Sequence, residues 1–165
     1  MVFINTVSNY NIYFLECFKM IKELNDNKRK IVLSLLGIIL VNVVFSFFRA
    51  NNEPVEEVLT FSFTLTGYLL SAFFSPFFEE TLMRGIFQNY LMKKKWLNNL
   101  WISIVLSSVF ALLHLDLFFL PYFITGLILS NLFIKTNGSL LSNIVVHSLY
   151  NNFVFIIFFL IKYLS

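Results

Sequence analysis

Residues 69–84 have the sequence LLSAFFSPFFEETLMR, which is apolar enough to cross a bilayer except for Glu79, Glu80 and Arg84. Ionisable side chains at membrane depth are energetically expensive and are usually retained where they act. The two histidines of the chain also lie in or beside apolar segments. The sequence therefore predicts chemistry inside a membrane, built from polar groups that separate apolar segments supply.

The composition is that of an integral membrane protein. Of the 165 residues, 58% are hydrophobic and 13% are charged. A soluble domain averages about 25% charged residues and roughly 45–50% apolar residues. The single cysteine, Cys17, excludes an internal disulfide. We expect no cleavable signal peptide, because the basic cluster 28–30 follows the first apolar residues instead of preceding them.

Five apolar segments approach or exceed the length of a membrane helix, which needs about 20 residues. They are residues 31–48, 58–92, 96–114, 118–134 and 140–161. Within residues 1–30, apolar and charged side chains recur at helical spacing, which predicts an amphipathic helix on the membrane surface. We therefore expect an all-α, polytopic transmembrane helix bundle of about five membrane segments plus an N-terminal amphipathic helix. Pro76 is expected to kink or break the second segment.

The basic residues are distributed asymmetrically along the chain. With the N-terminus inside, nine of the twelve Lys and Arg residues fall on the cytoplasmic side, which is the bias that orients membrane proteins. The sequence thus predicts a multi-pass protein of the cell membrane with a cytoplasmic N-terminus. Trp96 and Trp101 follow the lysine triplet 93–95 and are predicted to anchor this turn at the interface.

The first group of candidate site residues is Glu79-Glu80-x-x-x-Arg84. Glu80 and Arg84 are four positions apart, so they share a helical face and can pair. Glu79 lies about 100° further around the helix and is free for another role. A carboxylate in a low-dielectric site can serve as a base near neutral pH. The alternative is a buried ion pair that only fixes the packing of the helices.

Two further patterns each place a histidine one helical turn from a second side chain. Phe110-x-x-x-His114 ends the third segment, and His147-x-x-x-Asn151 lies in the fifth. The second pattern offers two hydrogen-bond donors that can stabilise a developing oxyanion. The alternatives are an interfacial histidine at a helix terminus and a polar clamp between helices, worth about 0.6–1.7 kcal/mol.

In this order and on separate segments, the three patterns resemble the CPBP family. That family comprises the CAAX prenyl endopeptidases and the related bacterial Abi and bacteriocin-immunity proteins. Arg84-Gly85, Trp96 and the residues SSVFALLHL around His114 are similar to the family as well. The resemblance covers about residues 60–155. It implies a protease core in residues 58–165, after an N-terminal part, residues 1–57, that holds the amphipathic helix, the first span and an outer loop.

The resemblance implies an intramembrane endopeptidase. Glu79 would be the general base that activates a water, with His114 assisting. His147 and Asn151 would hold the carbonyl oxygen as it becomes an oxyanion. The expected partners are a peptide or protein substrate at the membrane and the lipid bilayer itself, with no nucleic acid.

Glu80 and Arg84 would orient or support this site. No cofactor is favoured, but zinc held by Glu79, His114 and His147 is an open alternative, because two histidines and a glutamate can bind zinc. The sequence contains no His-Glu-x-x-His helix, and a metal-free glutamate mechanism is preferred. The catalytic interpretation requires that the three side chains converge within about 5–8 Å around a wet cavity.

Two other functions remain compatible with these patterns. One is a non-enzymatic bacteriocin-immunity or scaffold membrane protein of the same family, in which Glu79→Gln would leave protection intact. The other is a small transporter that uses the carboxylates as a proton relay. The sequence shows no paired inverted repeats of the kind common in transporters.

Overall fold

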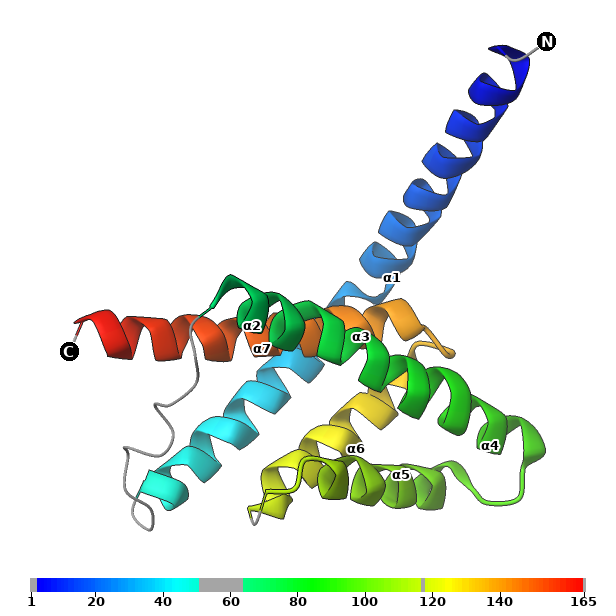
Figure 1. The fold of residues 1–165 in the computed structure, drawn as a ribbon. Coiled ribbons are helices and arrows are strands. Elements are labelled where there is room, and N and C mark those ends of the chain that lie inside the picture. Colours follow the sequence, from blue (N-terminus) through cyan, green and yellow to red (C-terminus); the bar gives the residue numbers. More distant parts are fainter. Residues whose placement is uncertain (1–2, 51–63, 117, 165) are drawn as a thin grey trace.

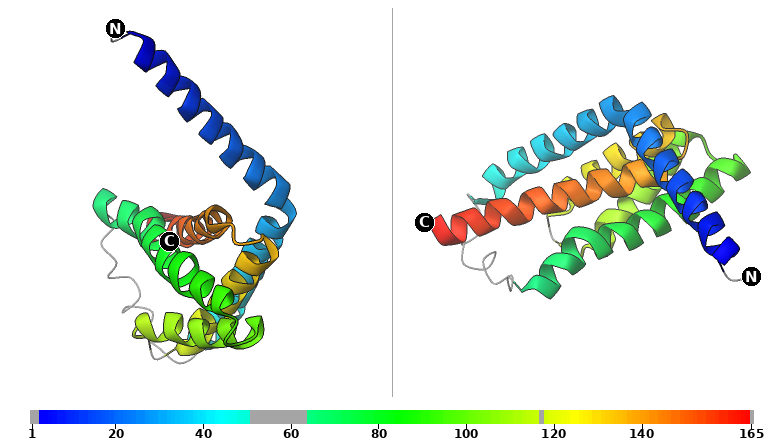
Figure 2. Two further views of the ribbon diagram at one scale, coloured as in Figure 1. Left: turned by 90° about the vertical axis from the view of Figure 1, so that its right-hand side faces the viewer. Right: turned by 90° about the horizontal axis from the view of Figure 1, so that it is seen from above.

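The structure is a computed structural model that describes residues 3–50, 64–116 and 118–164. Within these ranges the chain is all-helical, as predicted, and contains no strand. The longest helix, α1 (Phe3–Ala50), crosses the bundle, and its N-terminal half projects away from the other helices (Figures 1 and 2). Its C-terminal half packs against α6 (Phe119–Lys135) and α7 (Leu140–Leu164).

The boundary expected near residue 30, between a surface helix and a first span, is not present. The helix α1 runs without interruption through the basic cluster 28–30. Charged residues do not break a helix, and the chain has no glycine before Gly37 and no proline before Pro54. The amphipathic segment and the first apolar segment are therefore two halves of one helix.

The second predicted segment, residues 58–92, corresponds to a continuous helical run over residues 65–94. Residues 58–63 of the predicted segment lie outside the described ranges. The run alternates between α-helical and π-helical turns: α2 (Leu65–Leu69), η2 (Leu70–Phe74), α3 (Ser75–Glu80), η3 (Thr81–Gln88) and α4 (Asn89–Lys94). Pro76 does not break this run. It lies in the first turn of α3, directly after the wide turn η2, and local π-helical turns of this kind accommodate the N–H that proline lacks.

The third predicted segment forms a shorter helix than expected, whereas the helix of the fourth has the predicted length. The helix α5 (Asn99–Leu113) has 15 residues and α6 has 17. Among the described helices, α1 and α7 contain stretches long and apolar enough to cross a membrane, and 6% and 11% of those stretches are buried inside the protein. Few of their side chains are therefore fully buried inside the protein. The number of membrane crossings stays a prediction.

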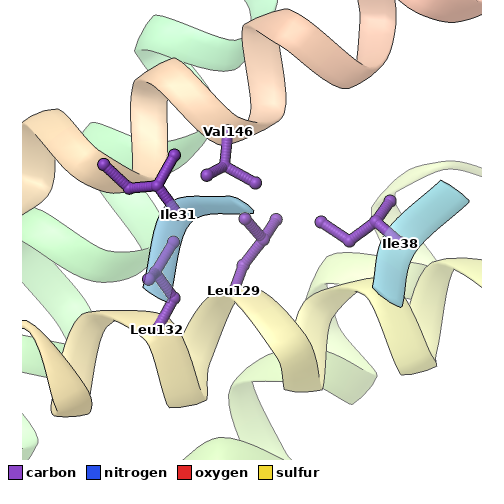
Figure 3. Packing of buried hydrophobic residues seen from close by; sticks show 5 residues of the cluster. All are labelled: Ile31, Ile38, Leu129, Leu132 and Val146. Atoms are coloured by element: carbon purple, nitrogen blue, oxygen red, sulfur yellow. The ribbon is translucent and has the colours of Figure 1, made fainter. Parts of the chain in front are cut away.

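The helices around the site pack through two apolar clusters. Ile31 and Ile38 of α1 meet Leu129, Leu132 and Val146 of α6 and α7 in one cluster (Figure 3). The second cluster joins η3 to α5 and consists of Met83, Ile102, Leu106 and Phe110. As Figure 2 shows from above, α7 lies between the C-terminal half of α1 and the run from α2 to α4.

A close approach between α5 and α6 depends on Gly126. A Cβ atom at this position would lie 3.0 Å from the Cβ atom and 3.1 Å from the Cα atom of Ser107. Small residues at such contacts let helix backbones come together in membrane proteins. The contact brings the carbonyl groups of α6 within reach of η3, where they take part in the site.

Candidate active site

Glu80 and Arg84 form the predicted ion pair, and both side chains are buried, with exposed fractions of 0% and 1%. Arg84 Nη1 donates to Glu80 Oε1 over 3.2 Å, and Arg84 Nη2 donates to the carbonyl oxygen of Gly126 over 3.0 Å. The guanidinium carbon also lies 5.0 Å from the centre of the Phe110 ring, in a cation–π contact. Burial of this pair is sustained by hydrogen bonds as well as by charge.

Helix α7 completes the surroundings of Glu80. Asn143 Nδ2 donates to Glu80 Oε2 over 3.2 Å and to the Leu129 carbonyl oxygen over 2.8 Å. His147 Nδ1 lies 2.9 Å from Glu80 Oε1. Because an ionised carboxylate can only accept hydrogen bonds, this nitrogen carries a proton and donates a hydrogen bond to Glu80. Glu80 is therefore held by α7 and η3 together, and it fixes the orientation of the His147 ring.

Glu79 has different surroundings from its neighbour, as the sequence predicted. Its side chain is 31% exposed. Ser75, one turn earlier, donates from Oγ to Glu79 Oε1. Glu79 Oε2 accepts no hydrogen bond from the described residues and lies 3.9 Å from His147 Nε2. Both oxygens of Glu80 thus accept hydrogen bonds from the protein, whereas Glu79 keeps one buried oxygen without a donor among the described residues.

A cavity of about 250 Å³ opens beside Glu79. Since one water occupies roughly 30 Å³ in the liquid, the cavity has room for a water together with part of a larger molecule. Its wall is mainly apolar and combines residues from three elements: Glu79, Leu82, Met83, Phe110, Leu113 and His114. Glu79 and His114 are the two ionisable side chains of this wall.

His114 terminates α5 and faces the same cavity. Its Nδ1 lies 2.8 Å from the Phe110 carbonyl oxygen, so this nitrogen is the protonated one in the neutral ring. The ring stacks on Tyr122 with centres 4.3 Å apart and contacts Phe110 at 4.6 Å. Because Phe110 also contacts the His147 ring at 6.0 Å, one aromatic side chain lies against both histidines. In neutral His114, the lone pair is on Nε2.

Asn151 makes a contact that the spacing of its motif did not predict. Its Nδ2 donates to the Ser71 carbonyl oxygen in η2 over 2.8 Å. One turn of α7 is thereby tied to the wide turn η2. At this position the amide serves as a polar clamp between helices, the alternative named for this motif, and one hydrogen of Nδ2 remains for a second acceptor.

Three polar residues of this region were missed from the sequence, although each repeats the spacing of a recognised residue. Asn143 is four positions before His147, and Ser75 is four positions before Glu79. Gln88 is four positions after Arg84 and donates from Nε2 to the Ser130 carbonyl oxygen over 3.1 Å. Because i and i+4 residues share a helical face, a search for polar side chains one turn from each candidate would have found all of them.

The zinc alternative requires that Glu79, His114 and His147 converge on one point. Nδ1 of His147 is bound to Glu80 and Nδ1 of His114 to a backbone carbonyl group, which leaves Nε2 of each ring for another partner, as in many metal-binding histidines. Within the described ranges, no group of at least three His, Cys, Asp or Glu side chains is placed to hold a metal ion. We therefore derive no catalytic step through a metal.

Comparison with known proteins gives the family of this chain. The sequence profile of the type II CAAX prenyl endopeptidase Rce1-like family matches residues 61–153. The chain belongs to this family. The match covers more than half of the chain and contains every candidate site residue, so the family relationship inferred from the three sequence patterns is confirmed. No curated protein and no solved structure gave a match.

Membership of the Rce1-like family supports a CAAX-type intramembrane protease as the kind of function, and hence a hydrolase. The long apolar stretches of α1 and α7, which are little buried within the protein, also support a location in a membrane. The orientation of the N-terminus, the division into residues 1–57 and 58–165, and the roles of individual side chains stay predictions. So does the relation to the Abi and bacteriocin-immunity branch.

Proposed function

We propose that this Rce1-like chain is an intramembrane endopeptidase that hydrolyses a peptide bond of a membrane-associated substrate with a water activated by Glu79. The observation that carries the proposal is the difference between the two adjacent carboxylates. Glu80 is fully buried and bonded to Arg84, Asn143 and His147. Glu79 lines the same cavity as His114, and its Oε2 accepts no hydrogen bond from the described residues. A general base needs such an available oxygen.

In the proposed reaction, a water in the cavity gives a proton to Glu79 Oε2 while its oxygen attacks the carbonyl carbon of the substrate. The lone pair on His114 Nε2 accepts the second hydrogen of this water and so orients it. The proton on Glu79 then passes to the leaving nitrogen, the C–N bond breaks, and a carboxylic acid and an amine are released. Exclusion of bulk water by the apolar wall strengthens each of these polar contacts.

His147 is proposed as the donor to the developing oxyanion. Its Nδ1–H is held by Glu80, so a protonated ring would present Nε2–H towards Glu79 Oε2, 3.9 Å away. The positive charge of this ring would be balanced by the two carboxylates beside it. The second hydrogen of Asn151 Nδ2 would assist. Glu80 and Arg84 act as positioning residues, because Glu80 holds His147 and Arg84 holds Glu80.

The test is Glu79→Gln, which keeps the size and shape of the side chain and removes the base. The purified chain is reconstituted in vesicles with prenylated CAAX peptides and other membrane peptides, and new peptide termini are identified by mass spectrometry. Since a general base contributes about 10²–10⁴-fold, the turnover number of Glu79→Gln should fall by at least about 100-fold.

The matched control is Glu16→Gln on the exposed face of α1, where Glu16 pairs with Lys19. This variant should cleave at the rate of the native chain. Cleavage by Glu79→Gln at the native rate would refute the assigned base. As a second measurement, treatment with a zinc chelator should leave turnover unchanged, and its abolition by the chelator with recovery on adding zinc would favour the metal mechanism instead.

A further inference from the structure

The turn between α4 and α5 combines positive charge with exposed aromatic side chains. Lys93, Lys94 and Lys95 end the run from α2 to α4, and the exposed stretch continues through residue 100. Trp96 is 70% exposed and Trp101 is 55% exposed. None of these side chains contributes to the wall of the cavity beside Glu79, so the catalytic proposal does not account for them.

Within the part of the chain that the structure describes, no acidic side chain neutralises the charge of this turn. The sequence contains no Asp or Glu between Glu80 and Asp116. Among the ion pairs of the described residues, none involves Lys93, Lys94 or Lys95. Lys94 Nζ instead lies 5.5 Å from the centre of the Tyr90 ring. The three ammonium groups are therefore available to an anion from outside the chain.

The aromatic side chains of the α4–α5 turn favour a position at the surface of a membrane. Tyr90 and Trp96 contact each other edge to face, with ring centres 6.4 Å apart. Asn98 caps α5 by accepting from the backbone N–H of Trp101 over 3.0 Å, and the helix that follows has no charged residue over Asn99–Leu113. Tryptophan and tyrosine concentrate where a membrane meets water. A polar, triply basic turn followed by a charge-free helix marks such a boundary.

The tertiary arrangement supports this placement. In Figure 1, the α4–α5 turn and the α6–α7 turn lie towards the right-hand end of the bundle, and the C-terminus lies at the opposite end. At the α6–α7 turn, Lys30 Nζ donates to the Lys135 carbonyl oxygen over 2.7 Å, which adds further positive charge to the same end. There, however, Lys30 also bonds Asn27, whereas the ammonium groups of the α4–α5 turn have no hydrogen-bond acceptor among the described residues.

We propose that the α4–α5 turn, residues 93–101, binds the phosphate groups of anionic phospholipids and thereby anchors the N-terminal end of α5. The lysine ammonium groups supply the charge, and the two tryptophans hold the turn at the depth of the headgroups. Each basic residue near an anionic leaflet contributes attraction that falls off within a Debye length. An acidic protein partner could also bind the three lysines, but it would cover the two tryptophans and keep them away from lipid. The test distinguishes a lipid partner from a protein partner.

Trp96 and Trp101 are the two tryptophans of the chain, so its intrinsic tryptophan fluorescence reports this turn alone. The full chain is reconstituted in vesicles of zwitterionic phosphatidylcholine that contain a small fraction of brominated phosphatidylglycerol or, in parallel, brominated phosphatidylcholine. Bromine quenches tryptophan at short range. The anionic brominated lipid should bind beside the turn about fivefold more strongly than the zwitterionic one.

The triple variant K93Q/K94Q/K95Q should lose this preference, so that both brominated lipids quench equally. The matched control K22Q/K28Q/R29Q removes the same charge from exposed positions of α1 and should keep the fivefold preference. Equal quenching by the two lipids in the native chain would overturn the proposal, and so would loss of the preference in both triple variants. Tryptophans that neither brominated lipid quenches would place the turn in water and would also overturn it.

Discussion

Replacement of Arg84 by methionine is expected to destabilise the protein by about 3–5 kcal/mol, because it leaves a buried carboxylate without its charged partner. The side chains of Glu80 and Arg84 are 0% and 1% exposed, so neither can recover hydration by a small movement. The same change removes the donor to the Gly126 carbonyl oxygen. Glu80 retains its hydrogen bonds with His147 and Asn143, which do not replace the ion pair with Arg84.

The pair can be tested with a double-mutant cycle of Arg84→Met, Glu80→Gln and the combined variant. For a chain of this size, each kcal/mol lowers the melting temperature by about 2–4 °C. Each single variant should therefore melt about 6–20 °C below the native chain. The combined variant should be more stable than the sum of the two single effects predicts, by about 1–3 kcal/mol, because neither charge is left alone.

The assay is unfolding of the purified chain in detergent micelles, followed by far-ultraviolet circular dichroism. Lys19→Met is the control, since its pair with Glu16 is exposed and should contribute little. The reasoning fails if the single variants melt with the native chain, or if the two single effects add. Additivity would mean that Glu80 and Arg84 are stabilised separately by their other contacts and not by each other.

Two further predictions concern contacts that hold the site together. Asn143→Leu removes the donor to Glu80 and to the Leu129 carbonyl oxygen, so the turnover number should fall by about tenfold with little change in KM, as expected for a positioning residue. A tenfold rise in KM at an unchanged turnover number would instead mean that Asn143 acts in substrate binding. Asn152→Leu, further along α7, is the comparison for the general effect of losing an asparagine from this helix. Gly126→Val places a side chain 3.0 Å from Ser107 Cβ and should destabilise by about 1–3 kcal/mol. Ser107→Gly should recover part of that loss, and a fully stable Gly126→Val would show that α5 and α6 can separate.

Local spacing was sufficient to predict part of the site. The i, i+4 separation of Glu80 and Arg84 predicted their pairing, and the structure confirms it at 3.2 Å. The angle between adjacent helix positions predicted different surroundings for Glu79, whose side chain is 31% exposed while that of Glu80 is buried. These outcomes depend on the geometry of a single helix, which the order of residues alone specifies.

Local spacing was misleading where helices meet or continue. Pro76 and the basic cluster 28–30 were expected to mark boundaries, yet the helix continues through both. Local π-helical turns accommodate the N–H that a proline lacks, and Pro76 directly follows such a turn, η2. The contact of Asn151 with the Ser71 carbonyl oxygen depends on where α7 lies against η2, and no pattern within α7 contains that information.

The sequence by itself determined the helical class, the apolar character of the segments, the family, and which acidic and imidazole side chains stand one turn apart. These are properties of composition and of helical periodicity. The tertiary structure alone decided that Glu80 joins Arg84 to His147 and Asn143, and that Glu79 and His114 line one cavity. The reason is that Asn143 and His147 lie 63 and 67 positions after Glu80 in the chain and meet it only when α7 packs against α3 and η3. That packing depends on side-chain volumes and small-residue contacts across several helices.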